Sequence, residues 1–120
     1  MKKKAEFDWL RRQDDTSEFE EFLAALPIKD AAKLLAAIQN TETLGIQVAI
    51  QMQWVKKLED DLYELRSKQG SDIQRVIYFH KIETKYLITH GFTKKTQKTP
   101  ENEIEHAREM RRQYREGKLK

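Results

Sequence analysis

The sequence has no cysteine, two prolines and four glycines among its 120 residues. Without cysteine the chain can form neither a disulfide nor a cysteine-rich metal site, which is compatible with a reducing cytosol. No run of apolar residues approaches the length of a membrane span. The length suits one domain over residues 1–120, and we expect a soluble cytoplasmic protein with no membrane partner.

Charge is distributed unevenly along the chain. Residues 1–65 contain 9 Lys/Arg and 13 Asp/Glu, a net charge of −4, whereas residues 66–120 contain 14 and 7, a net charge of +7. The excess is concentrated in residues 66–100, which hold 8 basic and 2 acidic residues. This distribution favours a polyanionic partner, nucleic acid above all, and a basic face that is merely solvated stays the alternative.

The N-terminal part predicts a short strand and two helices. Polar and apolar residues alternate over residues 5–10, as in a half-buried strand. Ser17 lies three residues before Glu20, a capping box that predicts a helix start. An apolar stripe with helical spacing follows at Phe19, Phe22, Leu23 and Leu26. After Pro27, which ends or kinks that helix, a second stripe predicts a helix that ends near Asn40: Ala31, Leu34, Leu35 and Ile38.

The segment 46–54 fits two structures. Its apolar residues alternate with glutamines at a period of two, which favours an extended segment. No proline or glycine interrupts it after Gly45, so a helix is nearly as plausible. We favour a strand-like connection, followed by a turn at residues 59–61.

Three segments predict an antiparallel meander, at residues 62–66, 73–80 and 85–92, because they are joined by short connections. Residues 73–80 are rich in β-branched and aromatic residues. The connections are a loop at residues 69–72 and a tight turn at residues 81–83. The unbroken apolar run from Val76 to Phe79 predicts that both faces of the central strand are covered.

A C-terminal helix is predicted after Thr99, with Thr99 as its cap, Pro100 at its first position and Glu101 in its first turn. Its narrow apolar stripe comprises Ile104, Ala107, Met110 and Tyr114. The predicted fold class is therefore α+β. It has a small, mainly antiparallel β-sheet, made of the N-terminal strand and the three-stranded meander, packed by two N-terminal helices and followed by a C-terminal helix.

The meander is expected to gather basic residues at one edge. The end of its first strand lies beside the start of its second, which brings Arg66 and Arg75 close together. The third strand ends at the same edge and adds His90, Phe92, Lys94, Lys95 and Lys98. Bidentate arginine contacts and lysine point charges suit a phosphodiester. For His90 the alternative is a packed histidine bonded to a backbone carbonyl.

The sequence lacks the residue patterns that other kinds of catalytic or binding site require. The three histidines His80, His90 and His106 have no ligand-type spacing, so we expect no metal and no cofactor. There is no glycine-rich phosphate loop and no Ser-His-Asp arrangement. The chemistry that remains is metal-independent RNA cleavage, in which the 2′-hydroxyl attacks its own phosphate. The protein then has to orient the backbone, move protons and stabilise the phosphorane.

Three blocks of the sequence resemble the RelE/ParE superfamily of bacterial toxins, and most closely its HigB-like, phage-derived branch. The blocks are Leu62-Tyr63-Glu64-Leu65-Arg66, Arg75-Val76-Ile77-Tyr78, and His90 to Pro100 followed by Glu103-Ile104 and Ala107. The resemblance covers about residues 55 to 116. It implies a toxin of a type II toxin-antitoxin system that cleaves mRNA in the ribosomal A site. Its partners would be ribosome-bound mRNA and a cognate antitoxin, usually a helix-turn-helix protein.

The resemblance also implies roles for single residues. Arg66 and Arg75 would bind the scissile phosphate, His90 would transfer a proton, and Lys94 and Lys95 would neutralise developing charge. Tyr78 and Phe92 would stack on a base, and the further RNA-binding residues would be Lys57, Lys68 and Lys98. The general base is left open between His90 and a lysine whose pKa is lowered by neighbouring cations. Two alternative functions are gyrase poisoning, as in the ParE branch, and non-catalytic nucleic-acid binding by a module of phage origin.

Overall fold

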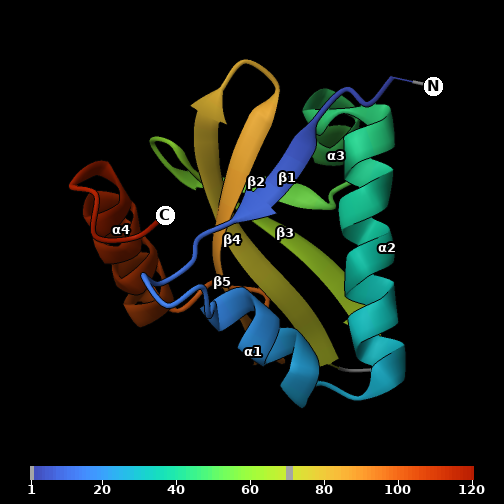
Figure 1. The fold of residues 1–120 in the computed structure, drawn as a ribbon. Coiled ribbons are helices and arrows are strands. Elements are labelled where there is room, and N and C mark those ends of the chain that lie inside the picture. The colour runs from blue at the N-terminus through green and yellow to red at the C-terminus, as the bar shows by residue number, and fades with distance from the viewer. Residues whose placement is uncertain (1, 70–71) are drawn as a thin grey trace.

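The computed structural model describes residues 2–69 and 72–120, and all of their side chains except those of residues 68 and 69. The elements in chain order are β1 (Glu6–Trp9), α1 (Glu18–Ala25), α2 (Ile28–Leu44), α3 (Ile46–Gln51), β2 (Val55–Glu59), β3 (Leu62–Gln69), β4 (Asp72–Ile82), β5 (Lys85–Lys94) and α4 (Glu101–Arg115) (Figure 1). This order confirms the predicted α+β class. Positions 70 and 71 of the predicted 69–72 loop lie outside the described residues.

Within the described residues the strands form one five-stranded sheet in the order β1-β5-β4-β3-β2. β1 runs parallel to β5, and the other neighbours are antiparallel. The meander therefore has four strands and not the predicted three, because residues 55–59 pair with β3 as an edge strand. β2 ends this pairing at Val55 opposite Leu65, so the part of β3 that begins at Arg66 extends beyond β2.

Two predictions about the N-terminal half were wrong. Residues 46–51 form helix α3 and not a strand, because burial there follows helical spacing: Ala49 is buried and Ile46, three residues earlier, is half-buried. Helix α2 runs to Leu44 and not to about Asn40. Its last turn is anchored by polar contacts that an apolar stripe does not indicate, since a carboxylate oxygen of Glu42 accepts a hydrogen bond from the Phe7 amide at 2.9 Å.

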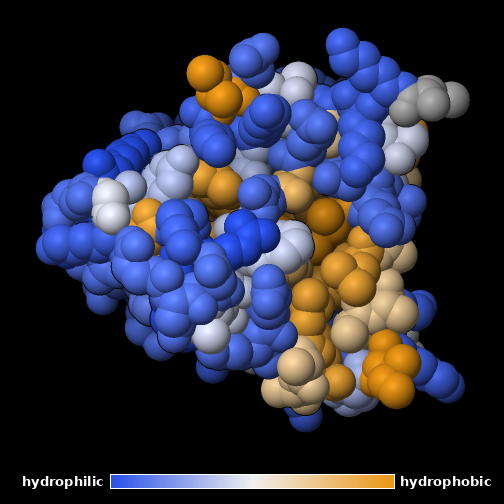
Figure 2. Space-filling model, in the orientation of Figure 1, coloured by the Kyte–Doolittle hydropathy of each residue, from blue (hydrophilic) through white to orange (hydrophobic). Residues whose placement is uncertain are grey.

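Helices cover both faces of the sheet, as the apolar run in β4 predicted. Figure 1 shows α4 on one side of the sheet and α2 on the other. On the α1/α2 side the core contains Phe19, Leu34, Leu65, Val76 and Ile88, and on the α4 side it contains Leu62, Ile77, Phe79, Ile104 and Met110. In Figure 2 hydrophilic residues cover the α4 side, and hydrophobic residues gather between α1 and α2. No helix in the described ranges combines the length and hydrophobicity of a membrane span.

The two predicted helix caps have different outcomes. The Ser17 hydroxyl accepts a hydrogen bond from the Glu20 amide at 3.0 Å, so the predicted start of α1 is confirmed. Thr99 does not cap α4: Pro100 occupies the cap position, and the Thr99 hydroxyl donates to the carboxylate of Glu64. The start of α4 is thus tied to β3 by a side-chain contact.

Candidate nucleic-acid interface

Side chains from three adjacent strands gather on the α4 face of the sheet. In the backbone register Arg66 lies opposite Arg75, and Arg75 lies opposite Phe92. His90 lies opposite Ile77, two residues further along each strand and therefore on the same face. The predicted proximity of these residues is confirmed, whereas their roles stay predictions.

Glu64 is the residue of this cluster that sequence reasoning missed. Its side chain is fully buried and accepts hydrogen bonds from Nε and Nη2 of Arg66, the former at 3.0 Å. The other carboxylate oxygen lies 3.7 Å from Nη1 of Arg75 and accepts from the Thr99 hydroxyl. The two arginines are therefore held by one carboxylate, which offsets their repulsion. The available sequence signal was an acidic residue two positions before Arg66 in the same strand.

Arg75 does not reach the surface. Its side chain is completely buried, and its guanidinium donates to the carbonyl oxygens of Thr96 and of Lys98, the latter at 3.3 Å. Burial lowers the pKa of Arg75, opposed by the charge of Glu64. The predicted contact of Arg75 with the scissile phosphate does not fit this burial. Arg75 instead holds in place the loop that carries Lys95 and Lys98.

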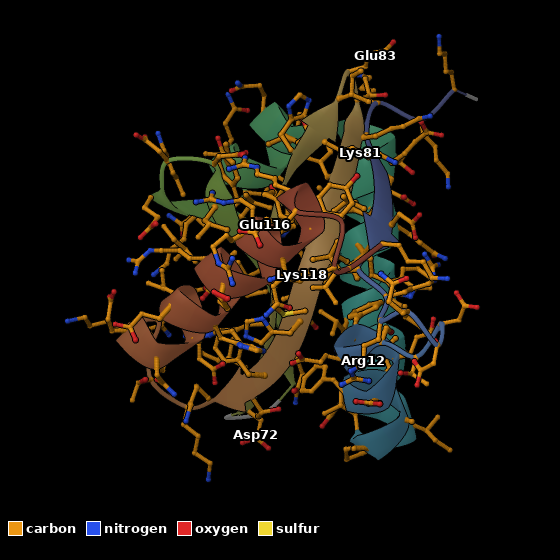
Figure 3. The ribbon with its side chains drawn as sticks, turned by 60° about the vertical axis from the view of Figure 1, so that its left-hand side comes forward. Arg12, Asp72, Lys81, Glu83, Glu116 and Lys118 are labelled. Atoms are coloured by element: carbon orange, nitrogen blue, oxygen red, sulfur yellow. The ribbon has the colours of Figure 1, made fainter. Side chains whose placement is uncertain are left out.

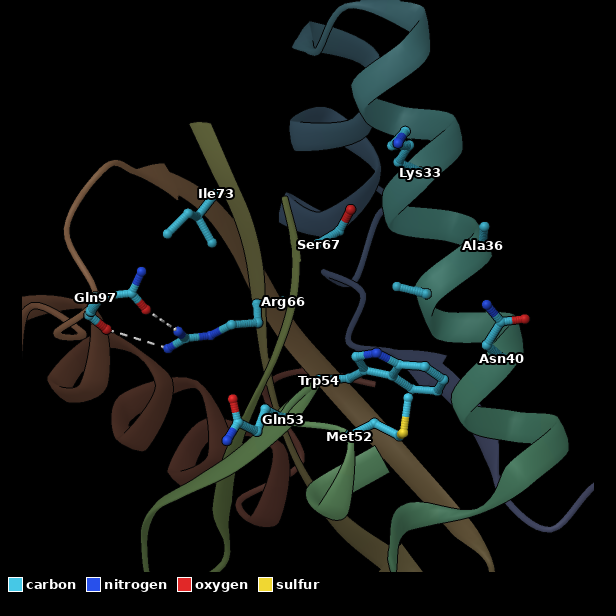
Figure 4. Close-up of a pocket in the computed structure, with 11 residues that line it drawn as sticks. Lys33, Ala36, Asn40, Met52, Gln53, Trp54, Arg66, Ser67, Ile73 and Gln97 are labelled. Carbon is cyan, nitrogen blue, oxygen red and sulfur yellow. Dashed lines mark hydrogen bonds between the residues drawn. The ribbon is translucent and has the colours of Figure 1, made fainter. Parts of the chain in front are cut away.

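Arg66 is the arginine that reaches solvent, with 19% of its side chain exposed. Its Nη1 donates to the side-chain oxygen of Gln97 at 2.9 Å, and its Nη2 donates to the Gln97 carbonyl oxygen at 3.3 Å (Figure 4). Two oxygens thus occupy the guanidinium fork, which is the arrangement that a phosphate adopts on arginine. The side chains of Lys94, Lys95 and Lys98 are exposed on the adjoining segment.

His90 is packed beneath α4. It is 3% exposed, its Nε2 lies 3.0 Å from a carboxylate oxygen of Glu103, and its Nδ1 lies 3.0 Å from the Thr89 hydroxyl. The ring of His106, which itself contacts Glu18, lies edge-on at 4.7 Å. Burial lowers the pKa of His90, helped by the charge of His106 and opposed by the hydrogen bond to Glu103. The structure therefore agrees with the alternative that His90 is a packed histidine. Its hydrogen-bond partners are side chains and not the expected backbone carbonyl.

The two aromatic residues predicted to stack on a base are core residues. Tyr78 is fully buried on the opposite face from Arg66, with the ring of Tyr63 stacked on it at 5.4 Å. Burial raises the pKa of its hydroxyl. Phe92 is 7% exposed and belongs to the core under α4. Base stacking by either ring does not fit this burial.

The remaining predicted lysines are separated from Arg66 or lie outside the described side chains. Lys57 lies opposite Tyr63 on the edge strand, and its ammonium pairs with Asp60 at 3.3 Å. That pair is near the turn at the other end of β3 from Arg66. The backbone of Lys68 pairs with Ile73, but its side chain is outside the described part. Within the described part, no group of three or more His, Asp or Glu side chains could hold a metal ion.

A cavity of about 690 Å³ lies next to Arg66, between α2 and the free part of β3 (Figure 4). It is lined by Lys33, Ala36, Ala37, Asn40, Met52, Gln53, Trp54, Arg66, Ser67, Ile73 and Gln97. Sequence reasoning assigned no function to its α2 residues or to Trp54, since no local pattern connects positions 33, 54 and 97.

The sequence model of one protein family, described as phage-derived protein Gp49-like (DUF891), matches residues 21–112. The chain belongs to this Gp49-like family. No protein with a curated description matches the sequence. The matched range of the Gp49-like chain includes strands β2 to β5, the cluster around Glu64 and the whole lining of the cavity.

The basic end of the Gp49-like sheet is well separated from the opposite end. Figure 3 shows Asp72, at the start of β4, and Lys81, near its end, at opposite extremities of the molecule. Arg75 and Arg66 belong to the Asp72 end. Lys81 is exposed and provides a basic residue of matched charge outside the candidate interface.

Proposed function

We propose that this Gp49-like protein is the toxin of a type II toxin-antitoxin system and acts as a metal-independent endoribonuclease on ribosome-bound mRNA in the cytoplasm. The family is related to RelE-type toxins of such systems, which supports the class. The HigB-like blocks around Arg66, Arg75 and His90 support the more specific assignment.

The observation that carries the proposal is the set of hydrogen bonds that the Arg66 guanidinium makes. The buried carboxylate of Glu64 holds it from one side, and the oxygens of Gln97 occupy its outward-facing donors. An RNA phosphate that displaced Gln97 would find a preoriented bidentate donor. The exposed Lys94, Lys95 and Lys98 would add positive charge around it.

In the proposed reaction the ribose 2′-oxygen bonds to the adjacent phosphorus and the bond to the 5′-oxygen breaks. The products are a 2′,3′-cyclic phosphate and a 5′-hydroxyl. Arg66 would stabilise the charge that develops on the non-bridging oxygens, because donors placed beforehand need no reorganisation. One group removes the 2′-proton and one protonates the leaving oxygen. In the folded chain the exposed lysines reach the RNA, whereas His90 would do so only after α4 moves aside.

A cognate antitoxin is part of the same proposal. Large apolar side chains are exposed on α2 and α3 or directly after them. Ile28 is 88% exposed, and Leu35, Leu44, Ile50 and Met52 are between 41% and 55% exposed. Exposed apolar groups of this kind favour a protein partner. We therefore expect the antitoxin to cover part of the α2/α3 surface.

The test is translation in a cell-free system with purified protein from which metal ions have been removed by prior dialysis against a chelator. We expect the wild-type protein to stop synthesis and to leave mRNA fragments with 5′-hydroxyl ends. Arg66→Ala should reduce cleavage by about 10²- to 10³-fold, as expected for the loss of a donor to the transition state. Lys81→Ala, which removes the same charge at the far end of the sheet, should cleave normally.

Unchanged cleavage by Arg66→Ala, or intact mRNA with undiminished synthesis in the presence of the wild-type protein, would refute the proposal. The same mRNA without ribosomes tests ribosome dependence directly. Inhibition of DNA supercoiling without mRNA cleavage would instead indicate a gyrase poison on the same fold.

A further inference from the structure

The cavity beside Arg66 exists because β2 is shorter than β3. β2 starts at Val55, and the residue before it, Trp54, is held to β3 by one backbone hydrogen bond, from the Arg66 amide to the Trp54 carbonyl oxygen at 2.9 Å. Helix α2 forms the opposite wall with Lys33, Ala36, Ala37 and Asn40. The volume of about 690 Å³ lies within the range of small-ligand sites.

The lining has a distinct chemistry. Among the described residues that line the cavity are the cations Lys33 and Arg66 and no aspartate or glutamate. Three side-chain amides, those of Asn40, Gln53 and Gln97, supply both donors and acceptors. An aromatic ring, a pair of cations and neutral amides are the groups with which proteins bind an unpaired nucleotide.

Trp54 and Arg66 lie where they can contact two different parts of one ligand. Their backbones are bonded to each other, yet their side chains diverge. In Figure 4 the indole extends toward α2, whereas the guanidinium points to Gln97. The indole is half-buried. A strand whose phosphate binds Arg66 would therefore have a neighbouring base within reach of the indole.

We propose that this cavity binds one unpaired base of the RNA, stacked on Trp54, next to the phosphate held by Arg66. The proposal rests on the proposed function for the identity of the polyanion. A segment of a protein partner is the other occupant to consider. The cationic and amide lining, continuous with the phosphate-binding fork of Arg66, favours the nucleotide.

The experiment uses a deoxy strand, which lacks the attacking 2′-hydroxyl, so that binding is measured without cleavage. The chain has two tryptophans, and Trp9→Phe leaves Trp54 as the single indole. We expect a short single-stranded oligonucleotide to quench the Trp54 fluorescence. An abasic strand with the same number of phosphates should bind about five- to a hundred-fold more weakly and leave the fluorescence unchanged.

Two variants separate stacking from folding. Trp54→Phe keeps a ring and should retain most of the affinity, whereas Trp54→Leu keeps apolar bulk and should bind the base-bearing strand no better than the abasic one. Circular dichroism confirms that both are folded. Equal affinity of the Trp9→Phe protein for the two strands, including no binding of either, would overturn the proposal and leave the cavity to a protein partner. Failure of the proposed function shows separately, as undiminished cleavage by Arg66→Ala.

Discussion

Replacing Glu64 with alanine is expected to destabilise the protein far more than removing an exposed ion-pair partner. The Glu64 side chain is fully buried and holds Arg75, which is also fully buried, together with the guanidinium of Arg66 and the hydroxyl of Thr99. Alanine would leave the charge of Arg75 buried without a counter-charge. It would also remove the acceptor that ties the start of α4 to the sheet.

The expected loss follows from this burial. Breaking a buried ion pair by removing one partner costs about 3–5 kcal/mol, because the remaining charge keeps its desolvation penalty. For a chain of 120 residues, 1 kcal/mol corresponds to about 4 °C in Tm, so the expected decrease is about 12–20 °C. Arg112→Ala is the matched control, since its pairs with Glu109 and Glu116 are about half exposed and screened by solvent, so they should contribute little to stability.

Thermal and urea unfolding followed by circular dichroism measure both effects. Glu64→Gln should lie between wild type and Glu64→Ala, because the amide keeps the volume and one acceptor. Combining Glu64→Met with Arg75→Met should recover part of the loss, since the double variant removes both fully buried charges of this cluster. A loss of stability for Glu64→Ala no larger than that for Arg112→Ala would show that the carboxylate does not stabilise Arg75.

Three further changes test other parts of the structure. Gly91→Ala should cost about 1–3 kcal/mol in urea unfolding, because an added Cβ would lie 2.9 Å from Cγ of Phe22; Phe22→Leu should recover part of it. The His90 pKa is lowered by burial, so its stabilising contribution is fully present above about pH 6.5 and is lost as the pH falls below that value. His90→Gln should flatten this dependence, and an unchanged slope would contradict it. Gln97→Ala should strengthen binding of the deoxy strand by up to about tenfold, because it frees Arg66; weaker binding would count against the displacement argument.

By itself the sequence determined the parts of the fold whose signals are local. The cap residue Ser17 sets the start of α1, and the β-branched segment from residue 73 forms the central strand. The proximity of Arg66 to Arg75 also followed, since a short connection between antiparallel strands leaves little choice of neighbours. Residues 46–51 escaped this reasoning because their apolar pattern fits both a strand and a helix. Burial of Ala49 against the rest of the chain decided it.

Only the tertiary structure decided which of the clustered residues reach solvent. Alternation along a strand tells which side chains share a face, but in a sheet covered on both faces it does not tell which of them are buried. Arg75, Tyr78 and His90 lie inside because α4 and the N-terminal helices close over them. Burying the arginine requires a counter-charge, which Glu64 supplies from the neighbouring strand. Of the two clustered arginines, Arg66 is the one that remains at the surface, beside a cavity whose walls come from segments far apart in the sequence.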